Sequence, residues 1–155
     1  MTNNRKRKGS QWERDAVNIL SNLIEKSKWK KLPTSGAMGT VLGEPLLTGD
    51  ITGEVEGFPL KFKVECKVGY SASPDREIKS FIIQKEWFDK IEEESDAANA
   101  IPFVMGKFDN VRAGVKNFVA MDTKVFAEIM NYITDLTKEL ELVYEKSEAK
   151  SRKDA

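Results

Sequence analysis

Three stretches of the chain repeat their apolar residues every three or four positions, which is the spacing that gives a helix one buried face. The first runs from Ser10 to about Lys26, and Ser10 and Glu13 form a capping box at its start. The second spans residues 78–94. The third begins at Asp122 or Thr123 and ends at about Glu145, before a charged tail. The pattern therefore predicts three helices, of which the last is long.

Short apolar or alternating segments lie between these helices and predict strands. They are an edge strand over 28–33, a hairpin over 50–55 and 58–67, and two later strands over 101–108 and 117–121. Segments 34–49 and 69–77, which contain glycine, serine and threonine or proline, are expected to be loops. The order of helices and strands predicts an α/β domain with a mixed sheet covered by helices.

The second strand of the hairpin alternates most clearly. Since neighbouring side chains of a strand point to opposite faces, its apolar and polar residues separate onto two sides. The apolar row is Phe58, Leu60, Phe62, Val64 and Cys66, and the polar row is Lys61, Lys63, Glu65 and Lys67. The polar face is expected to be exposed to solvent or to carry a functional site.

The composition excludes several kinds of chemistry. The chain has no histidine, which excludes a Ser-His-Asp triad and histidine-ligated zinc. A single cysteine, Cys66, excludes an intrachain disulfide and fits a reducing compartment. No apolar run is long enough to cross a bilayer, and no secretory leader is visible. We expect a cytoplasmic protein, in the host-cell cytoplasm if it is viral, with catalysis by carboxylates, lysines, hydroxyls or a metal.

Charge is distributed unevenly along a chain whose formal net charge is zero. Residues 1–31 hold nine basic and three acidic side chains, so this segment carries +6 and the remainder −6. A basic end can bind a phosphate backbone, although the run Arg5–Lys8 is equally consistent with a solvated tail. The predicted organisation is a flexible basic arm over 1–8, a single domain over 9–145 and a charged tail over 146–155.

The polar face of the hairpin strand holds the candidate chemistry. Glu65 and Lys67, two residues apart on a strand, share one face, and Asp50 begins the preceding strand, from which it can approach Glu65. Two carboxylates and the carbonyl of Cys66 would form a hard-oxygen site suited to Mg²⁺. Lys67 could hold or deprotonate a water, or offset charge on a phosphate. Alternating Glu and Lys on a strand is also an ordinary surface pattern, so this motif alone is degenerate.

Several motifs in order resemble the PD-(D/E)XK nuclease superfamily, and most closely its archaeal-type Holliday junction resolvases. The resemblance covers about residues 7–121. Its motifs are Arg7-Lys8-Gly9 with Glu13-Arg14, Ser35-Gly36, Asp50, Val64-Glu65-Cys66-Lys67-Val68, Ile101-Pro102 and Gly106-Lys107-Phe108. The chain departs from the family in a longer segment from Gly36 to Asp50, in its 69–77 loop and in its last helix.

The resemblance implies a restriction-endonuclease-like core of the order α-β-β-β-α-β, here with a long C-terminal helix. It implies an endodeoxyribonuclease that uses Mg²⁺, with Mn²⁺ able to substitute, and that acts as a homodimer on branched DNA. Asp50 and Glu65 would ligate the metal, Glu13 would contribute to the metal site directly or through a water, and Lys67 would position the attacking water. The residues placed on DNA are Arg5, Lys6, Arg7, Lys8, Arg14, Ser35 and Lys107.

Other interpretations of these residues and of the whole chain remain open. A helix cap accounts for Glu13, a turn for Ser35 and an edge position for Lys107. The chain could be a restriction-like or flap-cleaving nuclease of the same superfamily, because one active centre serves them all. It could also be a catalytically idle DNA-binding module, or a small α/β domain with no nucleic-acid role.

Overall fold

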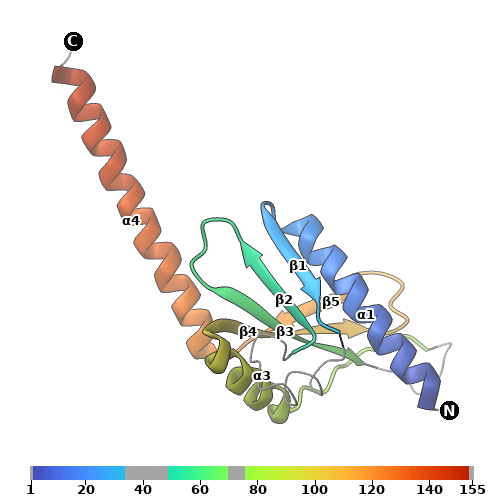
Figure 1. Cartoon of the computed structure of the whole chain (residues 1–155). Coiled ribbons are helices and arrows are strands. Elements are labelled where there is room, and N and C mark those ends of the chain that lie inside the picture. The colour runs from blue at the N-terminus through green and yellow to red at the C-terminus, as the bar shows by residue number, and fades with distance from the viewer. Residues whose placement is uncertain (1, 34–48, 70–75, 154–155) are drawn as a thin grey trace. The chain divides into compact units, whose positions relative to one another are not determined.

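The structure is a computed structural model that describes residues 2–33, 49–69 and 76–153, with side chains from residue 7 onward (Figure 1). The chain divides into two compact units, Met1–Met121 and Asp122–Ala155, and each is described by itself. The domain boundaries expected from the sequence, including the arm over 1–8 and the tail over 146–155, remain a prediction.

The described residues of the first unit form a mixed five-stranded sheet and two helices, as the sequence predicts. Its strands lie in the order β1-β2-β3-β4-β5 (Figure 1). Only β3 and β4 run parallel among the paired strands described, and the other neighbours are antiparallel. The elements are α1 (Thr2–Leu23), β1 (Ser27–Lys31), β2 (Ile51–Val55), β3 (Lys61–Gly69), α3 (Lys85–Ala98), β4 (Ala100–Phe108) and β5 (Asn117–Ala120).

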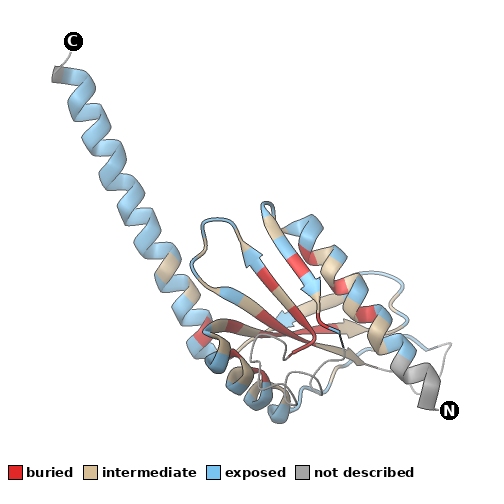
Figure 2. Cartoon of the chain, viewed as in Figure 1, coloured by how far each residue is buried: buried red, intermediate tan, exposed pale blue. Residues whose placement is uncertain are grey.

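Helices α1 and α3 pack against opposite faces of β3, and the alternating side chains of the strand separate between these two faces. Val64 and Cys66 belong to the apolar core beneath α1, to which that helix contributes Trp12, Ala16 and Leu20. The intervening polar residues of β3 lie on the side of α3, which packs against β3 and β4. Figure 2 shows the buried positions along the strands and on one side of α1.

A close approach on β2 explains why one strand position is a glycine. A Cβ atom added at Gly53 would lie 2.1 Å from a ring carbon of Trp29, which is buried on the neighbouring strand β1. The Trp29 indole N–H donates to Ser27 Oγ at 2.8 Å, so the ring is held in place over the glycine. The pairing of β1 with β2 therefore depends on the missing side chain.

The predicted start of the first helix is wrong, since α1 begins at Thr2 and places Ser10 in its interior. Instead of capping the helix, the Ser10 hydroxyl accepts hydrogen bonds from Lys31 Nζ at 2.6 Å and from the guanidinium of Arg14 at 3.2 Å. Side chains from β1 and from the next turn of the helix thus occupy the oxygen that a cap would use. The helix ends at Leu23, and Lys26 takes a left-handed conformation with φ of 52°.

The predicted helix over 78–94 begins later, at Lys85. Residues 78–84 are not helical, because two of their apolar side chains pack against the sheet instead. Phe81 and Ile78 lie over Gly69, where an added Cβ would come within 3.0 Å of both. The Phe81 ring also packs edge-on against Phe108 and Phe118. Tertiary packing therefore overrides the helical spacing in this segment.

The second unit consists largely of one helix, α4 (Thr123–Lys153). Of the two predicted cap residues, Asp122 is the one that caps: its Oδ1 accepts the backbone N–H of Lys124 at 2.7 Å. The helix continues past Glu145, where the sequence analysis placed the beginning of the charged tail. The extension includes the ion pair of Glu148 and Arg152, whose i,i+4 spacing supports a helix.

Candidate active site

Asp50 is held between two strands at the start of β2. Its backbone N–H donates to the carbonyl of Val64 at 3.0 Å, and its own carbonyl accepts the N–H of Leu32 at 2.9 Å. Its carboxylate Oδ2 accepts the backbone N–H of Cys66 at 2.8 Å, and the residue is only 7% exposed. The hairpin therefore brings Asp50 against the Glu65–Cys66 peptide.

Glu65 is the most enclosed carboxylate of the candidate set, with a side chain that is 4% exposed. One of its oxygens accepts a hydrogen bond from Lys67, and the other accepts one from Lys90 Nζ at 3.0 Å. Lys67 Nζ also lies 5.3 Å from the centroid of the Trp87 ring on α3. Since an unpaired buried carboxylate is unfavourable, the contacts with these two lysines stabilise Glu65 in its enclosed position.

Lys90 on α3 is the residue that the sequence analysis missed. Burial lowers its pKa, but the carboxylates of Glu65, Glu94 and Asp50 raise it by more, so its pKa lies above the ordinary value. Lys90 is thus within electrostatic reach of both candidate metal ligands. The sequence could have indicated Lys90 by its spacing, since it lies three residues after Trp87 and four before Glu94. Such spacings place side chains on one helix face.

Lys63 departs from the expectation that the polar face of β3 meets solvent or an open site. The residue is fully buried, at 0% exposed. Burial lowers its pKa, and the nearby carboxylate of Glu94 acts in the opposite direction. Burial in turn raises the pKa of Glu94. The cause is α3, which covers this face and converts a predicted surface into an enclosed polar layer.

Glu13 lies on α1, on the other side of β3 from Glu65. Its carboxylate pairs with Lys31 Nζ at 2.6 Å, and its side chain is 15% exposed. Glu13 is nevertheless near the centre of the set, because its charge acts on the thiol of Cys66. Burial raises the pKa of this thiol, and the charges of Asp50, Glu13 and Glu65 raise it further, against an opposing effect of Lys67. The charges of all four predicted residues therefore act on Cys66, although the residues do not share one face of β3.

The raised pKa of Cys66 leads to a prediction about its reactivity. The thiolate is the nucleophile in thiol chemistry, so a thiol with a raised pKa reacts slowly. At pH 8 we expect the folded protein to react with a disulfide reagent at least about tenfold more slowly than the same chain unfolded in urea. Absorbance of the released thiol measures both rates, and equal rates would contradict the buried, acid-surrounded position of Cys66.

Some of the predicted DNA-contacting residues gather on α1. Arg7, Lys8 and Arg14, with Ser10 and Gln11, line a hollow of about 380 Å³. Within it, the Arg14 guanidinium donates to Gln11 Oε1 at 2.9 Å, while Lys8 reaches Asp109 at 3.3 Å. The side chains of Arg5 and Lys6, and the whole of Ser35, lie outside the described residues.

Lys107 is placed next to α1 by strand β4. Its Nζ is 3.6 Å from Asp15 and 5.4 Å from the centroid of the Trp12 ring. The side chain is 37% exposed, so its charge remains accessible beside the basic residues of α1. The ion pair with Asp15 also explains a charged residue at this position without a role in DNA binding.

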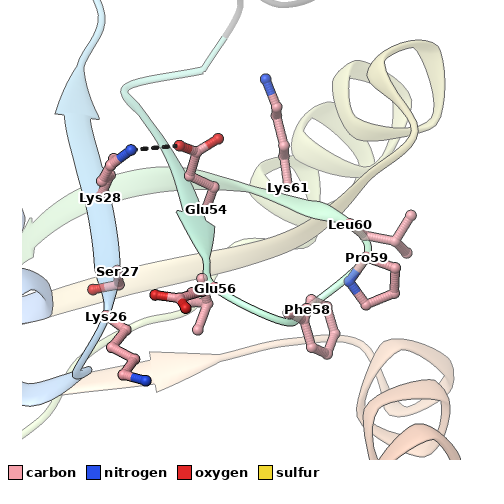
Figure 3. Close-up of a pocket in the computed structure, with 10 residues that line it drawn as sticks. Lys26, Ser27, Lys28, Glu54, Glu56, Phe58, Pro59, Leu60 and Lys61 are labelled. Atoms are coloured by element: carbon pink, nitrogen blue, oxygen red, sulfur yellow. Dashed lines mark ion pairs between the residues drawn. The ribbon is translucent and has the colours of Figure 1, made fainter.

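A second hollow, of about 540 Å³, lies at the turn between β2 and β3 (Figure 3). Its lining includes Lys28 and Glu54, which form an ion pair at 3.7 Å, and Phe58 and Leu60 from the turn. This is the opposite end of the hairpin from Asp50. The larger hollow is therefore separate from the carboxylate and lysine groups of the candidate site.

The donor chemistry of the site fits a divalent cation. Asp50 and Glu65 are buried carboxylates on adjacent strands, and oxygen is the ligand that Mg²⁺ prefers. In the parts of the chain that the structure describes, no three acidic or cysteine side chains are grouped closely enough to hold a metal. Both oxygens of Glu65 are instead paired with lysines, one with Lys67 and the other with Lys90. Asp50 and Glu65 would thus hold a cation in place of these lysine contacts.

The fold and site define an α/β protein in which an Asp immediately before β2 lies beside a Glu-x-Lys pair on the adjacent antiparallel strand β3 of a mixed sheet. Comparison with known families agrees with this class. The family described as "Phage putative PDDEXK endonuclease" matches residues 4–154, and the chain belongs to this family. The superfamily predicted from the ordered motifs is confirmed, and so is the restriction-endonuclease-like α/β fold with an added C-terminal helix.

Other comparisons add less. No curated protein matches the chain. Among solved structures, the chain is similar to Archaeoglobus fulgidus Hjc, a Holliday junction resolvase from an archaeal hyperthermophile. That similarity has 15% identity and a TM-score of 0.43, and it covers 77% of this chain and 92% of the other.

Family membership identifies the chain as a nuclease of the PD-(D/E)XK class, whose members generally use divalent metal ions. DNA is the substrate that this class implies. Within the described residues, no helix combines the length and apolar character needed to span a bilayer.

Proposed function

We propose that this chain is a Mg²⁺-dependent endodeoxyribonuclease that hydrolyses phosphodiester bonds in branched DNA, with four-way junctions as the preferred substrate. The observation that supports it best is the pairing of Asp50 with the β3 backbone next to the buried Glu65 and its partner Lys67. A buried acid–base pair beside a second fixed carboxylate is unusual for a structural surface, and it suits hydrolysis of a phosphodiester.

Asp50 and Glu65 are the residues that we assign to the metal. When bound, Mg²⁺ would supply Lewis-acid stabilisation of the negative charge on the phosphate. Asp50 is preorganised for this role because a backbone N–H fixes its carboxylate and two strand contacts fix its main chain. Preorganised ligands need little rearrangement on binding, which favours affinity.

Lys67 is assigned to the attacking water. Its side chain is 28% exposed, so Lys67 is accessible to solvent while it remains paired with Glu65. From this position it can hold a water by a hydrogen bond and offset charge developing on the phosphate. Glu13, held by Lys31 on the far side of Cys66, would act on the site through charge or a bridging water.

The DNA backbone is assigned to the basic residues of α1 and to Lys107. Arg7, Lys8 and Arg14 line one hollow, and Arg5 and Lys6 precede them on the same helix. Together with Ser35, these residues would contact phosphates, so recognition would follow backbone shape, and binding would weaken steeply with salt. We expect the active form to be a homodimer, since symmetric cleavage of a junction needs two active sites.

The substrate proposal predicts an order of cleavage rates. With Mg²⁺, and with Mn²⁺ as an effective substitute, four-way DNA should be cut at least about tenfold faster than linear duplex of the same sequence, because shape-based binding favours it. Gel assays on four-way, flap and linear DNA measure the order, with EDTA as the metal-free control. Equal cutting of linear duplex would contradict the junction preference, and faster cutting of flaps would favour the flap-nuclease alternative.

An idle DNA-binding module is the competing proposal from another class. It predicts salt-sensitive binding of branched DNA with no cleavage in Mg²⁺ or Mn²⁺. The buried, lysine-paired Glu65 argues against it, because a binding surface has no need of an enclosed carboxylate.

A further inference from the structure

The apolar residues of α4 follow the alternating three- and four-residue spacing of a coiled coil. This heptad pattern places its apolar side chains in one narrow row, which we call the α4 seam. Over its 18 residues the seam is about 26 Å long at 1.5 Å per residue. It consists of Phe126, Ile129, Ile133, Leu136, Leu140 and Val143.

The seam is exposed although its residues are large and apolar. Phe126 is 55% exposed, Leu140 56% and Val143 62%, and Ile133 and Leu136 are also exposed. Most helical stability in proteins comes from packing of an apolar face, and a contiguous exposed apolar surface marks an interaction site. A helix of 31 residues with such a row is therefore built to be covered.

The charged residues beside the α4 seam indicate which kind of partner could cover it. The seam is flanked mostly by uncharged side chains, including Met130, Thr137 and Tyr144. Residues 123–145, which hold the whole seam, carry two lysines and five acidic side chains, a net charge of −3, whereas residues 146–153 of the helix, beyond the seam, carry four basic and one acidic side chain. The negative charge along the seam disfavours an anionic lipid surface or DNA as its partner, since both attract basic faces.

The spacing of the seam is self-complementary. Its intervals are three, four, three, four and three residues, which read the same in both directions along the helix. A second copy of α4 therefore places an apolar residue against every layer of the first, whether the copies run parallel or antiparallel. Two identical seams also meet without forcing like charges into the contact, because the acidic residues lie mainly on the outer positions.

We propose that α4 is the helix through which two copies of this chain associate, as a two-stranded coiled coil along the α4 seam. The role of this dimer in DNA cleavage rests on the proposed function, which expects a homodimer. The association along the seam does not, because it requires neither DNA nor a metal ion. It assigns the interface to the C-terminal helix, which the resemblance to junction resolvases leaves unassigned.

Sedimentation equilibrium of the full-length chain, without DNA or metal, tests the seam. The parent should show concentration-dependent association to twice the chain mass of 17.5 kDa. Ile133→Glu combined with Leu136→Glu should halve that mass, because charges in the seam disfavour the contact. Asn131→Glu combined with Thr134→Glu adds the same charge at exposed positions outside the seam and should leave the dimer intact.

Tryptophan fluorescence separates loss of the dimer from loss of the fold. All three tryptophans, Trp12, Trp29 and Trp87, lie in the first unit and none lies in α4. The seam variant should therefore keep the parent's emission spectrum and midpoint of unfolding in the monomeric state.

Two results would overturn the seam proposal. The first is a parent protein that stays monomeric up to its solubility limit. In that case, a lowered midpoint of unfolding in the seam variant would indicate that α4 packs on its own chain. A dimer that survives in both variants would show that the copies associate elsewhere. Neither of these results bears on cleavage, which the DNA assays measure separately.

Discussion

Replacing Glu65 with Gln is expected to lower the rate of DNA cleavage by about 100-fold or more, because removal of one preorganised charge from an active site costs on this order. Gln keeps the shape of the side chain but loses the negative charge that would hold the metal and that pairs with Lys67 and Lys90. Single-turnover cleavage of four-way DNA at saturating Mg²⁺ measures the effect.

The matched control for this variant is Glu54→Gln. Glu54 is also on the hairpin, but it is half-exposed, pairs with Lys28 and lies at the end away from Asp50. An exposed pair contributes little, so this variant should cleave at about the parental rate. Thermal unfolding of both proteins establishes that they are folded. If folded Glu65→Gln protein cut DNA as fast as the parent, the metal assignment would be wrong.

Replacing Trp12 with Ala is expected to lower the free energy of unfolding by about 3–5 kcal/mol, the range for removing a buried aromatic side chain. Trp12 is 2% exposed and is among the largest fully enclosed side chains of the described residues. Its indole N–H donates to the carbonyl of Met105 on β4 at 3.3 Å. Truncation would leave a cavity between α1 and the sheet and would remove the hydrogen bond to this carbonyl.

Urea unfolding followed by circular dichroism measures this loss. Leu23→Ala, on the same helix, is the control, because Leu23 is 76% exposed and its truncation should change stability by less than about 0.5 kcal/mol. Similar small losses in both variants would mean that Trp12 does not anchor α1. Since Glu13 follows Trp12 directly, the same experiment tests how the first helix positions its acidic residue.

The charges around Glu65 connect the two parts of the proposed mechanism, which are metal binding by the carboxylates and positioning of the water by a lysine. Lys67 from the same strand and Lys90 from α3 both neutralise a carboxylate that is almost fully enclosed. A metal at this carboxylate would take over part of that role, which would leave a lysine ammonium available to water and phosphate. In the proposed mechanism, Lys90 would accordingly position the carboxylate of Glu65.

The strand pattern and the order of the acidic motifs could be predicted from the sequence because they are local properties. Alternation from Phe62 to Lys67 separates two faces in any strand, and those faces are the ones observed. The hairpin likewise follows from two adjacent strands, and it places Asp50 beside the Glu65–Cys66 peptide. Ordered motifs along 7–121 were sufficient to predict the superfamily that the family comparison confirms.

What covers each face could be decided only by tertiary structure. Lys63 looks like a surface residue in the sequence, yet α3 buries it, and Lys90 reaches Glu65 across a separation of 25 residues. Because Phe81 packs on the sheet, α3 begins only at Lys85, although the helical spacing of apolar residues starts earlier in the sequence. Local periodicity reports which side of an element is apolar. Burial and charge pairing depend on which distant element lies against that side, and consecutive residues do not encode this choice.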